Sequence, residues 1–475
     1  MKPDGIDPIA AVRSHFDRLL ATGLAVYGPR PSAMWMASLD TRTGRYPADD
    51  ARPAHLPKRV YRNIDAPKGC SLYWDQPSVV AAHALSAATG DDRYSAAADA
   101  YVRDFLARCV AANGILLWGN HYYYDAFRDA VMFFGGSEDP LPVDPAAERG
   151  LFHEIRPIPP AWDSFARVSP GAAERAVRAA ADGHVLDPET GRFQRHAWKE
   201  KRGCAFLEAG GILVEAMAWL AARNGDRSLV EAASRVAGYS FAHRGAATGL
   251  LENNPAEDRW DKRVTTSEVG LWAGCLLRAA ALAGRAEWRE MAAAAVSAWL
   301  AHAWDPAAGR FFGKVSVADG TPALGPKTTP YQPGDYCDLW EPLFPAHDYP
   351  MPMAESCLAL WTATGREEFL AGAERWAAVI GAGLPARGGR GGYAEYYGRC
   401  MHFLLGLADA TGRAEHRALA GRVAGEALAA LFAHGMFRGH PGEDRYDAVD
   451  GVGFLLLALV RLATGREPDM MGMGW

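Results

Sequence analysis

The chain has 475 residues, of which 49% are apolar and 22% charged, the composition of a globular protein with a large core. Its net charge is −6 and it contains no long basic run, which argues against a nucleic-acid-binding protein. No run of about 18 apolar residues occurs, so we expect no membrane-spanning helix. Length alone would suggest about two to four domains.

The first residues, Met1-Lys2-Pro3-Asp4-Gly5, lack the apolar stretch of a signal peptide, so we expect a cytoplasmic protein. The cysteines are odd in number, scattered and without CxxC spacing. This pattern indicates mostly buried thiols in a reducing compartment. They are Cys70, Cys109, Cys204, Cys275, Cys337, Cys357 and Cys400.

Six short turns with a glycine each follow an Ala- and Leu-rich helical stretch. A glycine just past a helix end is the usual C-terminal cap. Another Ala-rich amphipathic stretch follows each of the first five turns, which predicts paired helices. The long first gap predicts a hidden, divergent repeat. The glycines are Gly90, Gly225, Gly284, Gly365, Gly412 and Gly465.

A second loop recurs at residues 40–46, 187–193 and 305–311, with Asp first and Gly-Arg-aromatic last. Each copy follows a helix and should begin the crossing to the next one. Apolar periodicity predicts fourteen helices and no strand-rich block of convincing length. The helices should begin near residues 8, 76, 91, 122, 170, 204, 227, 267, 286, 350, 366, 392, 415 and 445.

Alternating long and short connections between paired helices predict an all-α fold, an (α/α)6-7 toroid with an inner and an outer ring of helices. Six or seven hairpins would both fit, and residues 1–475 would form a single catalytic domain. A helical solenoid and two unrelated bundles are the alternatives.

The long loops would share one rim of such a toroid, and they mix aromatic residues with Asn, His, Arg and carboxylates. The short turns contain hardly any aromatic residue. The mixture predicts a saccharide cleft with stacking platforms and charged anchors, against the alternative of plain loop composition. We predict substrate contacts from Trp74, His196, Asn254, Arg263, Trp340, Glu341, Tyr396, Arg399, His402 and His440.

Basic residues in these loops favour an anionic substrate despite the negative chain. They are Arg195, Lys199, Arg202, Lys262, Arg263, Arg399 and Arg445. The arrangement resembles carbohydrate-active enzymes built on α/α barrels, over most of the chain but without a specific motif. That group contains polysaccharide lyases, glycoside hydrolases and sugar 2-epimerases, and fold alone does not choose among them.

One motif favours a lyase. The stretch Gly119-Asn120-His121-Tyr122-Tyr123-Tyr124 resembles an Asn-Asn-His-x-Tyr-Trp signature of toroid lyases that act on uronic-acid polymers. Gly119 replaces the first Asn and Tyr124 the final Trp. We interpret the motif as the start of a helix, where N–H groups converge on an anion.

β-Elimination removes a weakly acidic proton beside a carboxylate, and donors that neutralise the carboxylate lower the cost of this step. The resemblance implies that Asn120 and His121 hold the uronate carboxylate or act as base. Tyr123 or Tyr336 would protonate the leaving oxygen. The alternative is a helix cap with packed tyrosines.

Two other enzyme classes stay open. Glycoside hydrolysis needs two carboxyl groups, for which Asp338 with Glu341 and Glu443 with Asp447 are candidates, although structural ion pairs would give the same pattern. A sugar 2-epimerase would need two opposed histidines, and isolated polar histidines are the alternative there. The candidates are His196, His347, His402 and His440.

We predict no cofactor and no metal, because His347-Asp348 and His440-x-x-Glu443-Asp444 lack the HExxH spacing of a zinc site. The expected partner is an acidic oligo- or polysaccharide, with no nucleic acid and no membrane. The sequence is compatible with a homo-oligomer. A saccharide-binding or scaffold protein without activity is the non-enzymatic alternative.

Overall fold

The computed structural model describes residues 6–49, 66–119, 121–134, 139–146, 151–197, 205–255, 263–325, 335–340, 350–386 and 392–474. The chain folds into two compact units. Unit 1 consists of residues 1–149, 160–173 and 384–473, and unit 2 of residues 150–159, 174–383 and 474–475. That residues 1–475 form a single catalytic domain stays a prediction.

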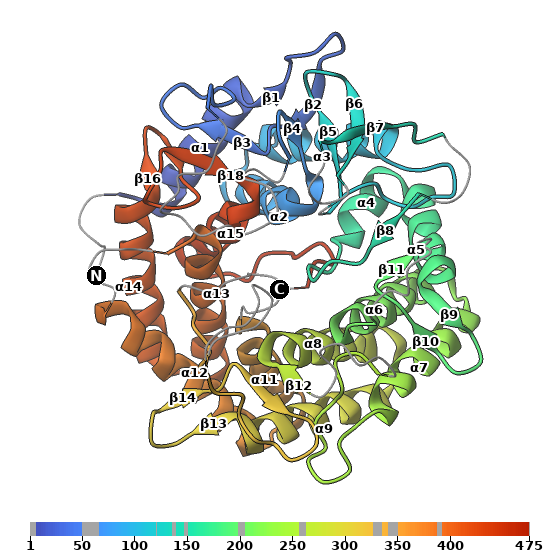
Figure 1. Ribbon diagram of the computed structural model, residues 1–475. Helices are drawn as coiled ribbons and strands as arrows, with labels where there is room; N and C mark the ends of the chain where they lie inside the picture. The colour runs from blue at the N-terminus through green and yellow to red at the C-terminus, as the bar shows by residue number, and fades with distance from the viewer. Residues whose placement is uncertain are drawn as a thin grey trace. The chain divides into compact units, whose positions relative to one another are not determined.

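Unit 1 contains seven α-helices and one 3-10 helix among its described residues (Figure 1). The helices are α1 (Pro8–Thr22), α2 (Leu72–Thr89), α3 (Arg93–Arg108), α4 (Trp162–Val168), α13 (Ala394–Thr411), α14 (Ala414–Leu431), η1 (Ala448–Asp450) and α15 (Val452–Thr464). Its strands are β1 (Leu24–Ala25), β2 (Ser32–Trp35), β3 (Ser38–Asp40), β4 (Gly69–Cys70), β5 (Tyr122–Asp125), β6 (Ala130–Phe133), β7 (Leu141–Val143), β16 (Phe432–Ala433), β17 (Met436–Phe437) and β18 (Arg445–Asp447).

Unit 2 holds the other seven described α-helices, with most of α5 in it. They are α5 (Pro170–His184), α6 (Leu207–Asn224), α7 (Arg227–Ala242), α8 (Thr266–Ala283), α9 (Ala286–Ala303), α11 (Met351–Thr364) and α12 (Glu367–Ala386). Its strands are β8 (His153–Glu154), β9 (Val185–Asp187), β10 (Arg192–Phe193), β11 (His196–Ala197), β12 (Arg263–Thr265), β13 (Trp304–Asp305), β14 (Arg310–Phe311) and β15 (Lys314–Ser316).

Helical hairpins are the repeating element of both units: α2–α3 and α13–α14 in unit 1, and α6–α7, α8–α9 and α11–α12 in unit 2. A left-handed glycine ends the first helix of each hairpin, as at Gly90 (φ 73°) and Gly225 (φ 74°). Space around both glycines is open, so the backbone conformation alone requires them. The predicted fold class, an all-α fold of the α/α-toroid type, is confirmed.

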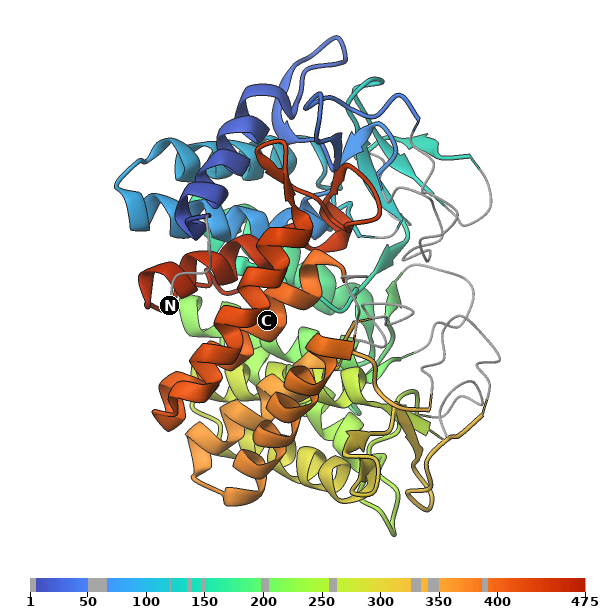
Figure 2. The ribbon, with the colours of Figure 1, turned by 90° about the vertical axis from the view of Figure 1, so that its left-hand side faces the viewer.

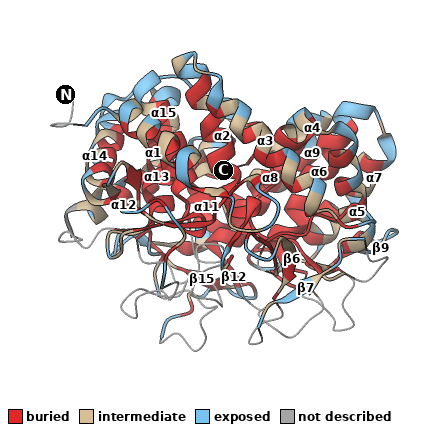
Figure 3. Cartoon of the chain, turned by 90° about the horizontal axis from the view of Figure 1, so that it is seen from above, coloured by how far each residue is buried: buried red, intermediate tan, exposed pale blue. Residues whose placement is uncertain are grey.

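The two helices of a hairpin differ in burial. Every residue of α6 from Leu207 to Ala221 is buried. By contrast, α3 buries only one stripe, at Tyr94, Ala98, Tyr101, Val102 and Phe105. Figure 3 shows α8, α11 and α13 mostly in the buried colour. First helices therefore form the core, and second helices cover it with an amphipathic face.

Within each unit the first helices pack side by side, and the equally buried α15 lies between two of them: α2, α15 and α13 in unit 1, and α6, α8 and α11 in unit 2. Two glycines allow this close approach. A Cβ at Gly398 would lie 2.4 Å from the backbone nitrogen of Leu455, and one at Gly270 would lie 2.3 Å from that of Met353. Because neighbouring first helices pack closely, the loops before them meet at one end.

The sheet around residue 122 corrects the sequence prediction. A helix beginning near 122 is wrong, because Tyr122–Asp125 is strand β5 in the antiparallel sheet β4-β5-β6-β7. Successive aromatic residues favour a strand over a helix. The carboxylate of Asp125 then accepts hydrogen bonds from the backbone nitrogens of Phe127 and Arg128, which turns the chain into β6.

Two further differences concern helix positions. The helix predicted near 445 begins only at Val452, because Arg445–Asp447 pairs as β18 with β3. Helix α4 is absent from the sequence prediction. The remaining predicted helices are present in the described chain, with starts within a few residues of the expected positions.

Segments from the two ends of the chain meet in unit 1. The Ser14 hydroxyl of α1 donates to the carbonyl oxygen of Gly435 at 3.0 Å, and Figures 1 and 2 show α1 beside the β16–β17 hairpin. The six described cysteines are buried free thiols, as predicted, and Cys204 lies outside the described residues. None of the described helices has the length and hydropathy needed to cross a bilayer.

Candidate functional site

Charged side chains concentrate in unit 2 around one carboxylate, that of Glu154. Strands β8 and β11 pair with His196 opposite Glu154. The Glu154 Oε1 atom accepts a hydrogen bond from Arg195 Nη2 and lies 3.1 Å from His196 Nε2. Arg156 Nη1 is 3.5 Å from the same oxygen. Two guanidinium groups and one imidazole therefore converge on a single oxygen atom.

This group, with Glu208, is called the Glu154 cluster below. Exposed fractions of the Glu154 and Arg156 side chains are 4%, against 10% for Arg195 and 21% for His196. Glu208 is fully buried, and burial raises the pKa of its carboxyl group although Arg195 and Arg156 oppose the shift. The cluster therefore places two guanidinium groups beside two carboxyl groups in a largely buried setting.

The start of α6 places Glu208 within the cluster. The side-chain oxygens of Asn254 and Asn253 accept from the backbone nitrogens of Ala205 at 2.6 Å and Leu207 at 3.0 Å. Between them, Phe206 has a φ of +55°, which costs free energy for a residue with a side chain. The Arg195 guanidinium lies 4.4 Å from the centroid of the Phe206 ring. The two asparagines thus hold a strained backbone under the arginine.

A buried histidine pair lies behind the cluster. His153 Nδ1 and His184 Nε2 are 2.6 Å apart, and His184 Nδ1 donates to the carbonyl oxygen of Gln194 at 2.9 Å. Burial lowers the pKa of His184 to about 4. His184 is therefore neutral near pH 7, with its Nε2 accepting the proton of His153. Since His153 precedes Glu154 on β8, this pair fixes the strand that carries the carboxylate.

Unit 1 has its own buried carboxyl group, that of Asp75 near the start of α2. Hydroxyl groups of Tyr446 and Tyr101 donate to its two oxygens at 2.7 Å and 2.9 Å. Burial raises the pKa of Asp75 to about 7, which the two tyrosine hydrogen bonds only partly offset. Both of these hydrogen-bond donors are neutral phenols, in contrast to the arginines around Glu154.

Other charged residues of unit 1 lie where α13 and α15 begin. The Glu395 carboxylate is 3.8 Å from Arg399 Nη1, and Glu443 is 3.6 Å from Arg445 Nε. The Asp447 carboxylate accepts from the backbone nitrogen of Val449 at 3.3 Å and caps η1. The hydrolase candidates Glu443 and Asp447 therefore both have structural partners.

Three of the four predicted catalytic residues, His121, Tyr123 and Tyr336, lie in the described part of the chain. Asn120 lies outside the described residues. His121 extends the β5–β6 hairpin, and its Nδ1 donates to the carbonyl oxygen of Phe134 at 2.7 Å. Tyr123 is buried in the sheet opposite Met132. The interpretation of this motif as a helix start is wrong, since the β-ladder pairs the backbone that was expected to bind an anion.

Tyr336, in unit 2, is held by the β13–β14 hairpin. Its hydroxyl donates to Asp305 at 2.7 Å, and this hydrogen bond raises the pKa of the phenol. The ring also stacks on Phe312, with centroids 5.1 Å apart. A part for Tyr336 in protonating a leaving group stays a prediction.

Among the predicted binding residues of unit 1, Trp74, Tyr396 and Arg399 are buried near the starts of α2 and α13. The His440 ring lies 4.7 Å from that of Tyr393, directly before α13. His402 lies further along α13.

His402 is buried beside Arg461, whose Nη1 is 3.1 Å from His402 Nδ1. Burial, Arg461 and Arg399 lower the pKa of His402 well below its usual value.

In unit 2, His196 belongs to the Glu154 cluster and Asn254 supports it. Arg263 is exposed at the start of β12, opposite Ser316. Trp340 is buried against Gly383. Glu341 lies outside the described residues, and substrate contacts of all these residues stay predictions.

The site residues predicted from the sequence do not include Glu154, Arg156, Glu208 and Asp75. Two of them carried a readable signal, since Asp75 and Glu208 each stand alone as an acid in an apolar helix start. Such an acid is costly to bury and hence informative. Glu154 and Arg156 gave no local signal.

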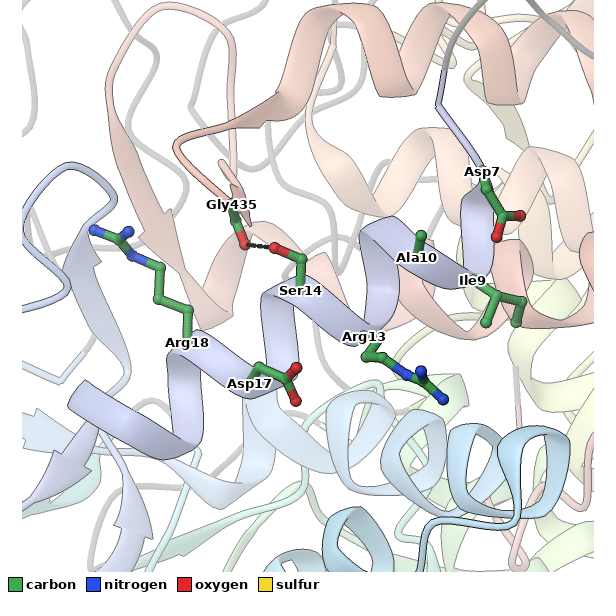
Figure 4. A pocket seen from close by; sticks show the side chains of 8 residues that line it. All are labelled: Asp7, Ile9, Ala10, Arg13, Ser14, Asp17, Arg18 and Gly435. Atoms are coloured by element: carbon green, nitrogen blue, oxygen red, sulfur yellow. Dashed lines mark hydrogen bonds between the residues drawn. The ribbon is translucent and has the colours of Figure 1, made fainter.

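A surface pocket of about 610 Å³ runs along α1 in unit 1 (Figure 4). Its lining alternates in charge through Asp7, Arg13, Asp17 and Arg18. The Asp17 carboxylate forms an ion pair with Arg93, with Oδ1 and Nη2 2.7 Å apart. The pocket therefore has mixed charges and does not concentrate charge of one sign.

The profile of a family described as periplasmic pectate lyase matches residues 76–208 of this chain. Every member of the Glu154 cluster lies inside that range.

Among solved structures, the chain is similar to a family 76 glycoside hydrolase from a bovine Bacteroides thetaiotaomicron strain, with 10% identity and a TM-score of 0.49 over 98% of this chain and 79% of that one. It is also similar to an inactive variant of an α-1,6-mannanase of Salegentibacter sp. HEL1_6, with 11% identity and a TM-score of 0.49 over 96% of this chain and 99% of that one.

An unsaturated glucuronyl hydrolase from Bacillus sp. GL1 matches with 14% identity and a TM-score of 0.42, over 64% of this chain and 84% of that chain. Each of these descriptions names an enzyme that acts on a carbohydrate. At such identities the likeness to solved structures concerns the fold alone.

Proposed function

We propose that this chain is a carbohydrate-processing enzyme, and specifically a polysaccharide lyase that cleaves uronic-acid-containing glycans by β-elimination. The observation that carries the proposal is the Glu154 cluster, in which two arginines and a histidine surround one carboxylate in a buried setting. All five members lie in the segment matched by the pectate lyase profile. The two guanidinium groups suit an anionic sugar.

Arginine is suited to this task because its guanidinium group can bind a carboxylate through two parallel hydrogen bonds. In the proposed complex, Arg195 and Arg156 stabilise the uronate carboxylate and so acidify the proton on the adjacent carbon C5. Low exposure of the cluster strengthens this effect, because charges interact more strongly away from water.

In the elimination, the C5–H bond breaks and its proton passes to a base. The electron pair forms the C4–C5 double bond, the C4–O bond breaks, and the leaving oxygen takes a proton. Within the cluster, His196 is the side chain suited to accept the C5 proton, and Glu154 orients its imidazole from 3.1 Å. The sequence prediction that Asn120 and His121 perform this step is a separate proposal within unit 1, so His121 is tested by its own variant.

The test is incubation of the purified protein with alginate, glucuronan and pectate. Ultraviolet absorbance of an unsaturated uronate and new reducing ends are followed together. We expect both to rise on at least one polymer. New reducing ends without the absorbance would contradict the lyase and favour the hydrolase, and no change on any saccharide would contradict both.

A glycoside hydrolase is the second candidate, favoured by the buried acids of unit 1. Asp75 has the raised pKa that a general acid needs, but tyrosine hydroxyls occupy both of its oxygens. Interconversion of monosaccharides without cleavage would instead favour a sugar 2-epimerase.

A further inference from the structure

Three aromatic side chains of unit 1 meet at the turn between β5 and β6, two strands that Figure 1 labels. Tyr27 stacks on Phe127 with ring centroids 4.6 Å apart and planes 21° apart. Tyr46 meets Phe127 edge-on at 5.8 Å, and its backbone nitrogen donates to the Tyr27 hydroxyl at 3.0 Å. Phe127 is 38% exposed. These three residues are called the Phe127 platform.

The backbone holds Phe127 at the surface. Asp125 accepts from the backbone nitrogens of Phe127 and Arg128, each at 2.9 Å. The backbone nitrogen of Ala126 donates to the carbonyl oxygen of Lys68 at 2.9 Å. Gly28 packs so closely on this turn that a Cβ there would lie 2.5 Å from the carbonyl oxygen of Ala126. A surface ordered in advance loses little entropy on binding.

Cations surround the platform. The Lys68 ammonium lies 6.0 Å from the centroid of the Phe127 ring. Side chains of Arg128 and Arg30 are 64% and 70% exposed. Their carboxylate partners, Asp125 and Asp129, are only 6% and 5% exposed. The two arginines next to this turn are therefore far more exposed than the carboxylates that pair with them.

We propose that the Phe127 platform is a second saccharide-binding surface, which takes a uronate-containing polysaccharide. The apolar face of a sugar ring packs on Phe127 while its hydroxyl groups stay in water. Lys68 and Arg128 bind the uronate carboxylates beside it. The choice of an acidic saccharide rests on the proposed function, whereas the platform itself uses no residue of the Glu154 cluster.

A second contact on the same polymer would raise the effective concentration of substrate. We therefore expect the platform to increase the affinity of the protein for the polymer.

The test is affinity electrophoresis through gels that contain pectate, alginate or neutral dextran. It uses an Arg195→Ala background so that the polymer stays intact during the run. Phe127→Ala should weaken retardation by the acidic polymer about tenfold, the size expected for loss of one aromatic contact. Leu141→Ala, which removes a 57% exposed apolar side chain from β7 of the same sheet, should have no effect. Lys68→Ala should weaken retardation at low salt only.

Unchanged retardation of Phe127→Ala would contradict the proposal that the platform binds a saccharide. Equal retardation by dextran would contradict the proposal that this saccharide is acidic. Failure of the lyase proposal gives a different result. In that case no polymer yields an unsaturated product, yet the difference between Phe127→Ala and Leu141→Ala in acidic gels persists.

Discussion

Two carboxyl groups are buried with different hydrogen-bond partners, Asp75 in unit 1 and Glu154 in unit 2. Asp75 accepts hydrogen bonds from neutral hydroxyl groups, and burial raises its pKa to about 7. Glu154 is surrounded by two arginines and a histidine. The two carboxyl groups therefore differ in their partners: neutral phenols donate to Asp75, whose pKa burial raises, whereas cationic guanidinium groups lie against Glu154.

The largest difference should appear in stability. Glu154→Ala leaves Arg156 and Arg195 buried without their shared carboxylate and should lower the free energy of unfolding by about 3–5 kcal/mol. Asp75→Ala at pH 5 removes a neutral group and should cost only about 1–3 kcal/mol. Urea denaturation measures both, and the control is Glu174→Ala, which removes a half-exposed ion pair with Arg178 on α5. Equal costs for both variants would remove the proposed distinction.

Activity gives the next largest effect. Arg195→Ala should reduce kcat/KM on a uronate polymer by about 10²–10³-fold, the loss typical for one donor to developing negative charge. Arg192→Ala, three residues earlier and exposed on β10, is the matched control and should leave the rate unchanged. Full activity of Arg195→Ala would show that the Glu154 cluster is structural and would remove its functional contrast with Asp75. His121→Ala on the same substrate tests the unit 1 alternative.

Local signals explain why most helices could be predicted. Each needed only its apolar period and a glycine such as Gly90 or Gly225 past its end. The helix predicted from residue 122 is wrong because Phe127, Val131 and Phe134 also fit a helical period. Strand β5 instead pairs with Gly69 and Cys70, which lie about fifty residues away along the chain.

The candidate site, too, depends on a partner that is distant along the chain. Arg195 and His196 stood out as charged residues in an aromatic loop, and the structure places both in the Glu154 cluster. Their shared partner Glu154 lies 41 residues before Arg195 and reaches both only through the β8–β11 pairing. Composition could therefore indicate the loop but not its carboxylate.

A third experiment tests the neutral character of Asp75 through pH. Its folded pKa of about 7 lies above the unfolded value of 3.8, so the folded state binds more protons between these values. Stability should be complete below pH 3.8 and fall by up to about 4 kcal/mol as the pH rises through 7. Asp75→Asn cannot titrate and should lack this fall. The readout is the unfolding midpoint from pH 4 to 8.

Asp92→Asn, an exposed change at the start of α3, is the control and should follow the wild-type profile. A parallel profile of Asp75→Asn and wild type would mean that folding does not raise the pKa of Asp75.

The smallest expected effect concerns a single hydrogen bond to Asp75. Tyr446→Phe removes the hydroxyl that donates to Asp75 at 2.7 Å and should cost about 1 kcal/mol at pH 5. Because this hydrogen bond lowers the pKa of Asp75, its loss should move the fall in stability to a higher pH than in the wild type. Tyr122→Phe, a buried tyrosine in β5, controls for loss of a hydroxyl elsewhere in unit 1. A shift to lower pH would contradict the assigned hydrogen bond, because only a hydroxyl that stabilises the neutral carboxyl would act in that direction.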